Sequence, residues 1–346
     1  MEIRLIKKSE WEKLAAFNAA EYKPNHILTN KLYYDWQFDN YANPEKDSYT
    51  SVGMFDQRQE LVGTFGRFPL PYTLYGKTVT GNCLANLIVK KNLRSLGFGY
   101  ILLEQASALG DIAIDHTINE TAWPLFMKAG WQGENLKRYI AILNSKNNLY
   151  DLPATFHPSA SEAAWRFERI ETFDGRITRF WQHIRDRYPI TIERTHEYLN
   201  WRYAKNPLTS YEQFVVEEGE TIIALIILRI EEVRREKPIG VRAARVIDFV
   251  ASKEAERFAL AQTIEFCRLH AVDFIDYFTS GNFHHNAFID AGFVDGNTFP
   301  YSSLPLLFNP VSTKRTHLNF AVKKNVPSAL ADWYTTKGGG DQDRPY

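Results

Sequence analysis

Residues 83–89 read Cys-Leu-Ala-Asn-Leu-Ile-Val, an apolar run that predicts a buried strand. Residues 94–99 follow as Arg-Ser-Leu-Gly-Phe-Gly, and residues 100–106 read Tyr-Ile-Leu-Leu-Glu-Gln-Ala. In this last piece the apolar side chains recur at the three-and-four spacing of a helix. An Arg-x-x-Gly-x-Gly turn therefore joins a predicted strand to a predicted helix.

This turn has the features of an anion-binding loop. Unpaired amides at a helix start point outward, and the helix dipole favours negative charge there. Gly97 and Gly99 allow the backbone to approach a phosphate closely, and Arg94 adds a forked donor. The turn differs from the Gly-x-Gly-x-x-Gly dinucleotide motif. The alternative is a glycine-rich turn that only changes the direction of the chain.

Composition restricts the class of protein. The chain has 346 residues, a length that favours two domains or one large one. Its 41 basic and 41 acidic residues cancel, so we expect no nucleic-acid or membrane partner. The longest apolar run, residues 222–228, is too short to span a bilayer, and the N-terminus lacks the layout of a secretory signal. Because only two cysteines occur, at 83 and 267, we expect buried thiols and a cytoplasmic protein.

The chain contains a repeated pattern. Tyr33-x-x-Trp36 and Tyr198-x-x-Trp201 are each followed by an aromatic residue and an Asn-Pro turn. Ala-Gly-Trp at 129–131 has a counterpart in Ala-Gly-Phe at 291–293, an offset of about 162 residues. The pattern predicts two copies of one unit of the α/β or α+β class. The paired aromatic residues are expected in the core rather than stacked on a sugar or base.

Four segments follow from this repeat. They are an N-terminal domain at 1–145, a linker at 146–162, a second domain at 163–310, and a C-terminal strand and tail at 311–346.

Two motifs in the first copy resemble those of the GCN5-related N-acetyltransferases. Val89-x4-Arg94-x2-Gly97-x-Gly99 is similar to motif A, the turn that holds the pyrophosphate of coenzyme A in that superfamily. The segment 119–131, Asn-x2-Ala-x2-Leu-Phe-x3-Gly-Trp, is similar to motif B. The resemblance implies two tandem domains, each a mixed, mostly antiparallel sheet flanked by helices.

The resemblance also implies that the first copy binds acetyl-CoA. The cofactor-binding residues that it implies are Leu87, Ile88, Val89, Arg94, Ser95, Leu96, Gly97, Phe98, Gly99, Tyr100, Asn119 and Phe126. Phe126 stands where the superfamily often has a tyrosine that protonates the departing thiolate, so the usual phenol is missing. Lys91 stands where a proline is common.

The second copy is expected to have lost the anion-binding turn. The offset carries Arg94 onto Glu256, and carries Gly97 and Gly99 onto Ala259 and Ala261. A carboxylate repels a phosphate, so we expect one cofactor per chain. The second copy then becomes a candidate for substrate binding, through Asp248, His284 and His285. No cysteine, aspartate or third histidine has ligand-like spacing near the histidine pair, so no metal is expected.

Three residues are candidates for the chemistry. His116 is placed where the fifth strand should end near the thioester, and histidine titrates in the useful range. Asn86 can orient a substrate or water but cannot accept a proton. Glu120 is a possible base, although a carboxylate at a helix start more often stabilises the dipole. A surface histidine is the alternative reading of His116.

The tail at 338–345, Gly-Gly-Gly-Asp-Gln-Asp-Arg-Pro, has the composition of a disordered terminus. Its ending also resembles that of double-domain acetyltransferase-like proteins encoded with bacterial surface-polysaccharide genes. That resemblance implies transfer of acetyl from acetyl-CoA to the amine of a nucleotide-linked amino sugar, for instance a UDP-4-amino-4,6-dideoxy hexose. The alternatives are an acyltransferase acting on a peptide or small amine, and a non-catalytic acetyl-CoA-binding protein.

Overall fold

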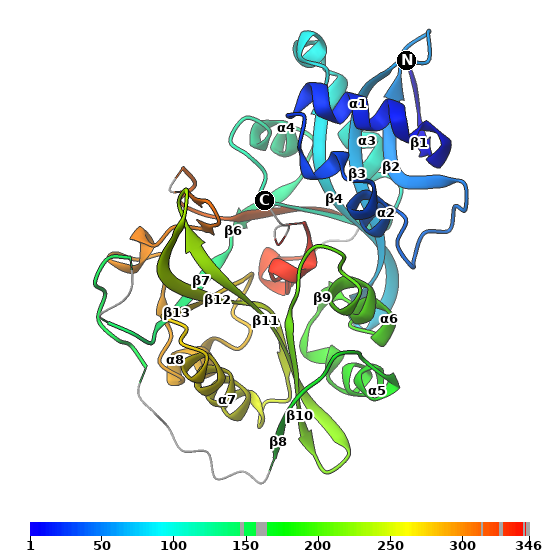
Figure 1. Ribbon diagram of the computed structural model, residues 1–346. Coiled ribbons are helices and arrows are strands. Elements are labelled where there is room, and N and C mark those ends of the chain that lie inside the picture. The colour runs from blue at the N-terminus through cyan, green and yellow to red at the C-terminus, as the bar shows by residue number, and fades with distance from the viewer. Residues whose placement is uncertain (146–148, 157–164, 313, 325–327, 342, 344–346) are drawn as a thin grey trace.

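Two β-sheets form the framework of the protein, each with its own helices (Figure 1). The computed structural model describes residues 1–145, 149–156, 165–312, 314–324, 328–341 and 343. Parts of the predicted linker, 146–148 and 157–162, and of the tail, 342 and 344–345, lie outside the described residues. Within the described residues, no helix is long and apolar enough to cross a membrane.

The first sheet has eight strands. In spatial order they are β1 (Glu2–Lys7), β2 (Ser48–Phe55), β3 (Leu61–Leu74), β4 (Lys77–Val89), β5 (Ile112–His116), β17 (Asn319–Lys324) and β6 (Gln132–Asn135), with β9 (Ile190–Ile192) paired to β3. Only β4 and β5 run parallel; the other neighbours are antiparallel.

The second sheet has seven strands. In order they are β14 (Val294–Asp295), β7 (Lys137–Ile142), β13 (Phe274–Thr279), β12 (Pro238–Ala251), β11 (Thr221–Arg234), β10 (Glu212–Glu218) and β8 (Arg166–Arg169). Again one pair, β12 with β13, is parallel. The series β8, β10, β11, β12 and β13 repeats the series β1 to β5, which confirms the predicted α+β class with two mixed, mostly antiparallel sheets.

The two sheets exchange strands. Only Leu136 separates β6 from β7, so the chain steps there from the first sheet into the second, where β7 pairs with β13. In return, β17 from the C-terminal end of the chain lies between β5 and β6 of the first sheet. The predicted boundaries at residues 145 and 310 therefore do not coincide with the division between the sheets. Sequence patterns indicate which residues form a strand, but not which strand edge they meet.

Four helices accompany each half. They are α1 (Trp11–Glu21), α2 (Lys31–Phe38), α3 (Phe98–Ser107) and α4 (Trp123–Lys128), then α5 (Gly175–Ile184), α6 (His196–Leu199), α7 (Glu256–Leu269) and α8 (His285–Asp290). Helix α3 buries Leu102, Leu103 and Ala106 in a core cluster that includes Leu84 of β4. This is the amphipathic pattern that the sequence predicts for residues 100–106.

The two copies meet at the repeated tryptophans. The indole N–H of Trp36 donates to the carbonyl of Trp201, and the indole N–H of Trp201 donates to the carbonyl of Trp36, each at 2.8 Å. The two rings stack with centroids 5.5 Å apart. Tyr33 and Tyr198 are each 2 % exposed, which confirms that the paired aromatic residues belong to the core. The reciprocal bonds give the interface a local two-fold symmetry.

The tail is ordered, which corrects the expectation of a disordered terminus for its described part. Gly338, Gly339 and Gly340 are buried, and Figure 1 shows this red segment between the two halves. From the second half, the guanidinium of Arg202 donates to the carbonyls of Gly338 and Gly340 at 3.0 and 2.7 Å. From the first half, His116 packs so closely that a Cβ on Gly340 would lie 2.6 Å from its Nδ1. The glycines are needed because the tail passes through a narrow space.

Replacing Arg202 with methionine tests how firmly the tail is held. The change removes a buried donor from two carbonyls, so the free energy of unfolding should fall by about 2 to 4 kcal/mol in urea denaturation. Arg169→Met is the matched control because its ion pair with Glu212 is largely exposed, and its loss should cost under about 1 kcal/mol. Equal losses for the two variants would show that Arg202 does not anchor the tail.

Candidate active site

An irregularity in β4 opens the first sheet. The register of β3 with β4 shifts between Thr64 and Gly66, so Asn86 and Leu87 together face Phe65. Asn86 adopts a φ of 63°, in the left-handed region that is rare for residues other than glycine. Such bulges bend a strand and re-aim its side chains, and they are frequent beside active sites.

The bulge coincides with the point at which β4 and β5 separate. Their parallel pairing covers 81–84 and 112–115, after which β5 ends at His116 while β4 continues along β3 to Val89. A cavity of about 290 Å³ occupies this position.

Five of the predicted site residues line the cavity. They are Asn86, Leu87, His116, Asn119 and Phe126. Other residues of its lining come from distant parts of the chain and were not predicted, among them Tyr22, Asp115, Arg315, Lys337 and Asp341. Glu120 is exposed and does not belong to the described residues that line the cavity, so its role as a base stays an unsupported prediction.

The predicted anion-binding turn lies in the same half. Gly97 has a φ of 81° and forms the N-cap of α3, so the backbone there requires glycine. At Gly99 an added Cβ would meet only Leu125, at 3.6 Å, which is an ordinary contact. Protein packing therefore does not explain the glycine at 99, and the backbone there is open to the close approach of a ligand. This geometry fits the diphosphate of coenzyme A.

Arg94 is half exposed and already has protein partners. Its Nε donates to the carbonyl of Val89 at 2.9 Å, and its guanidinium lies 3.3 Å from the carboxylate of Glu21. The amide of Lys91 also donates to Glu21. A diphosphate at this turn would therefore share the guanidinium with Glu21, a neighbour that the sequence did not reveal.

The remaining residues of the predicted cofactor set fall into two groups. Ser95 and Leu96 are exposed in a 3₁₀ turn, and Phe98 and Tyr100 are half-buried in the first turn of α3. Ile88 and Val89 are buried with their side chains in the hydrophobic core, so only their backbone is available to a ligand.

Two carboxyl groups share the cavity. The amide of Asn86 donates to the carboxylate of Asp341 at 3.0 Å, which brings the tail to the bulge. Asp115, at the end of β5, is 6 % exposed. Burial, together with the negative charge of Asp341, raises the pKa of Asp115 well above its usual value. The charged form of Asp115 is therefore disfavoured, whereas the carboxylate of Asp341 accepts a hydrogen bond from Asn86.

His116 reaches the cavity, as predicted, but its environment makes it a poor base. Its Nε2 is 2.7 Å from the hydroxyl of Thr335. Burial, with a smaller contribution from the positive charge of Arg202, lowers the pKa of His116 to about 3. A neutral imidazole with so low a pKa can orient groups by hydrogen bonding, but it accepts a proton weakly.

The corresponding residues of the second half are engaged in internal contacts. Asp248 is 1 % exposed and accepts two hydrogen bonds from Arg194, each at 3.0 Å. His284 is bonded to Glu256 and Tyr188, each at 2.9 Å. The role of Asp248 and His284 in binding substrate remains a prediction. The contacts that they make in the structure are with side chains of the protein itself.

His285 is exposed, and its Nδ1 lies 2.9 Å from the hydroxyl of Tyr139. The two adjacent histidines thus have different surroundings. In the described parts of the chain, no group of three or more His, Cys, Asp or Glu side chains is placed to hold a metal ion.

The offset of about 162 residues holds along the strand but not around the turn. Residues 252–255 connect β12 to α7, whereas the longer segment 90–97 connects β4 to α3. Glu256 is therefore the first residue of α7 rather than the counterpart of Arg94. Ala255, in a right-handed conformation, stands where the first half has the left-handed Gly97.

A pH titration followed by NMR tests the state of His116. The unfolded side chain binds a proton near pH 6.5 and the folded one only near pH 3, so acid should favour the unfolded state. The free energy of unfolding should fall as the pH drops below 6.5, by up to about 1.4 kcal/mol per pH unit from this group. The imidazole signal of His116, assigned with His116→Gln, should not titrate between pH 8 and pH 5. A midpoint near 6.5 would contradict the assignment.

Comparison with known proteins gives a consistent result for the fold. No protein-family profile and no curated protein matches the chain. Among solved structures, a GCN5-related N-acetyltransferase from Anabaena variabilis aligns with a TM-score of 0.59 at 11% identity, over 93% of this chain and 72% of the other. A probable N-acyltransferase from Enterococcus faecalis aligns with a TM-score of 0.58 at 11% identity, over 81% of this chain and 66% of the other.

A third similar structure is Saccharomyces cerevisiae N-myristoyltransferase with bound myristoyl-CoA and inhibitors. It aligns with a TM-score of 0.53 at 15% identity, over 98% of this chain and 86% of the other. Identities this low establish the fold alone. The chain shares with these structures an α+β fold that contains two mixed sheets.

Proposed function

We propose that this protein is an N-acyltransferase that uses acyl-CoA and has its active site in the cavity of the first half. The observation that carries the proposal is the separation of β4 from β5 at the bulge of Asn86, next to a glycine turn that opens α3. The similar structures support it, since they are an N-acetyltransferase, a probable N-acyltransferase and an N-myristoyltransferase.

The first half offers suitable groups for the cofactor. The amides after Gly97 and the guanidinium of Arg94 would hold the diphosphate, while Leu87, Asn119 and Phe126 line the cavity that would receive the acyl end. When bound, acyl-CoA supplies an activated thioester that the acceptor amine attacks directly, with departure of the thiol. We expect the backbone at the bulge to provide a hydrogen bond to the carbonyl oxygen.

The proton of the attacking amine needs an acceptor, and the tail provides one. Asp341 lies in the cavity, and Asn86 fixes its carboxylate by a hydrogen bond of 3.0 Å. Burial and the charge of Asp341 raise the pKa of Asp115, and His116 is a weak base, so Asp341 is the most suitable acceptor. Phe126 has no proton to give; Tyr22 carries a phenol at the same cavity and donates to the carbonyl of Asn86.

For the substrate we propose acetyl transfer to a nucleotide-linked amino sugar, with a role in the synthesis of surface polysaccharide such as O-antigen. The proposal is supported by the resemblance of the tail to that of double-domain acetyltransferase-like proteins encoded with bacterial surface-polysaccharide genes. In addition, Asp341 of the tail lines the cavity. Acceptor amines on a peptide or small molecule form the second candidate class. A non-catalytic acetyl-CoA-binding protein is the third, and Phe126 in place of the tyrosine favours it.

Release of free thiol from acetyl-CoA, measured with a panel of amino sugars, UDP-linked amino sugars, peptides and small amines, separates these candidates. Turnover with one class identifies the acceptor. Binding of acetyl-CoA without turnover across the whole panel would favour the binding protein and contradict the enzyme.

The substitution Gly99→Ala separates ligand binding from stability. Alanine is the better helix former, so the free energy of unfolding should rise by about 0.5 to 1 kcal/mol. A diphosphate that packs against this backbone would lose space to the added methyl group, so the Kd for acetyl-CoA, measured by calorimetry, should rise by about ten-fold or more. Gly175→Ala, at the start of α5, is the matched control, because its Cβ would meet only Arg179 at 3.7 Å. Unchanged affinity in Gly99→Ala would place the cofactor elsewhere.

The substitution Asp341→Asn tests the proton acceptor. The amide keeps the size of the side chain but cannot take a proton, so kcat should fall by about 100-fold or more while the Kd for acetyl-CoA changes little. Asp332→Asn is the control in the same tail, since Asp332 accepts from Tyr75 outside the cavity. If both variants keep the kcat of the wild type, the base lies elsewhere.

A further inference from the structure

Lys337 is a buried basic residue on the wall of the candidate active site. It lies in the short 3₁₀ turn Lys337–Gly339 of the tail, is 3 % exposed, and lines the same cavity as Asn86 and Asp341. Lysine is among the residues least often buried, because its charge is costly to remove from water. A lysine buried this deeply is normally paired with a group of opposite charge.

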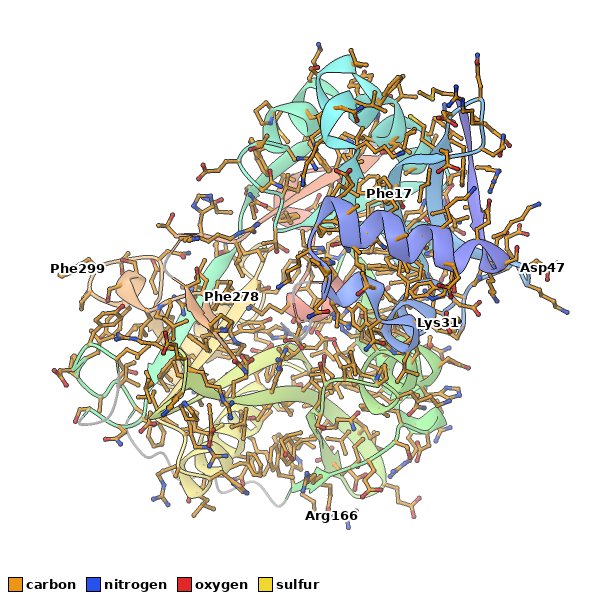
Figure 2. All side chains as sticks on the ribbon, turned by 45° about the horizontal axis from the view of Figure 1, so that its top comes forward. Phe17, Lys31, Asp47, Arg166, Phe278 and Phe299 are labelled. Atoms are coloured by element: carbon orange, nitrogen blue, oxygen red, sulfur yellow. The ribbon has the colours of Figure 1, made fainter. Side chains whose placement is uncertain are left out.

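Among the residues that the structure describes, no carboxylate lies within ion-pair distance of the Lys337 ammonium. No hydrogen-bond acceptor of the described chain pairs with it either; its one close contact there is the ring of Phe278, whose centroid is 4.8 Å from Nζ. Phe278 is 1 % exposed and is labelled near the middle of the molecule in Figure 2, whereas Phe299 at the edge is 86 % exposed. A ring face attracts a cation but does not neutralise it.

The neighbouring carboxylates each pair with an arginine, although Oδ1 of Asp276 and Oδ2 of Asp343 have no hydrogen-bond partner among the described residues. Asp276 pairs with Arg138 and Arg245, Asp343 pairs with Arg229, and Glu231 pairs with Arg229 and Arg245. Burial, followed by the charge of Arg245, lowers the pKa of Lys337 to about 7. The protein thus leaves Lys337 poised between the charged and the neutral form.

A second basic group lines the same cavity. Arg315 reaches it from the segment before β17 and donates from NH1 to the carbonyl of Thr117 at 2.9 Å. The cavity therefore contains carboxyl groups, Asp115 and Asp341, and basic groups, Lys337 and Arg315. A ligand that carries both an amine and an anionic group would match these two sets of charges.

We propose that Lys337, with Arg315, binds an anionic group of the acceptor substrate, a carboxylate or a phosphate, while the acceptor amine lies at Asp341. The inference rests on the proposed acyltransferase function and names its substrate class: amines that carry a negative charge. A bound anion would form an ion pair with Lys337. It would also raise the pKa of Lys337, so the side chain would take up a proton. A carboxylate would come from an amino-acid-like acceptor, and a phosphate from a nucleotide-linked one.

The test measures anion binding directly. Full-length protein is saturated with coenzyme A, so that the glycine turn is occupied, and is titrated by calorimetry with sodium acetate and, separately, with inorganic phosphate. Lys337→Met should weaken binding of the preferred anion by about ten-fold or more, and Lys337→Arg should keep most of it. Lys253→Met, on an exposed lysine of the second half, should bind like the wild type. Binding that is equal in Lys337→Met and the wild type overturns the proposal.

The wild-type protein provides a second readout that does not depend on a variant's folding. The pKa of Lys337 is lowered to about 7, so part of the protein carries it neutral at pH 7.5, and anion binding should take up a proton, seen as a buffer-dependent heat. The charged groups around it are Arg245, Asp276, Asp343 and Glu231, with Asp115 and Asp341 across the cavity. Uptake that persists in Lys337→Gln, or no uptake at all, contradicts the proposal.

Kinetics distinguishes the source of the anion. With acetyl-CoA saturating, Lys337→Met should raise the KM of a charged acceptor by about ten-fold and leave that of an uncharged amine unchanged. An effect on amino acids identifies the carboxylate, and an effect on UDP-linked amino sugars identifies the phosphate. An error in the proposed acyltransferase function would give a different result. Acetyl-CoA would then not bind at the glycine turn, whereas the binding of acetate or phosphate would still depend on Lys337.

Discussion

The structure depends on one local constraint, the departure of β4 from β5 at the left-handed bulge of Asn86. Two parallel strands that remained paired to their ends would leave no space between them. Because they separate, a cavity forms in the sheet beside the start of α3, and the side chain of Asn86 is free to hold Asp341 of the tail. The cavity, its charges and its proposed chemistry all follow from this separation.

The two halves share an architecture but have diverged in electrostatics. The first half keeps a glycine turn and an open cavity, whereas the second half fills the corresponding region with ion pairs, Asp248 with Arg194 and Glu256 with Arg187. Buried pairs of this kind fix a geometry and leave little room for a ligand. The exchanged strands and the tail, which is bonded to Arg202, join the halves into one structure around a single candidate site.

Features encoded locally were predictable from the sequence. The strand, the glycine turn and helix α3 follow from periodicity, the tandem sheets follow from the repeat, and the place of His116 at the end of β5 follows from both. Features that depend on contacts between distant parts of the chain could not be predicted from the sequence. The exchange of β7 and β17, the burial of the tail and the arrival of Asp341 and Lys337 depend on which segments meet in space. The low pKa of His116 depends mainly on burial and, to a smaller extent, on the charge of Arg202, far along the chain.

The most direct test of the central idea is a crystal structure with a non-hydrolysable acetyl-CoA analogue. We expect the diphosphate on the amides that follow Gly97 and the acyl group in the cavity between β4 and β5, within reach of Asp341. An analogue bound against the second sheet, or at a surface away from that cavity, would contradict the account.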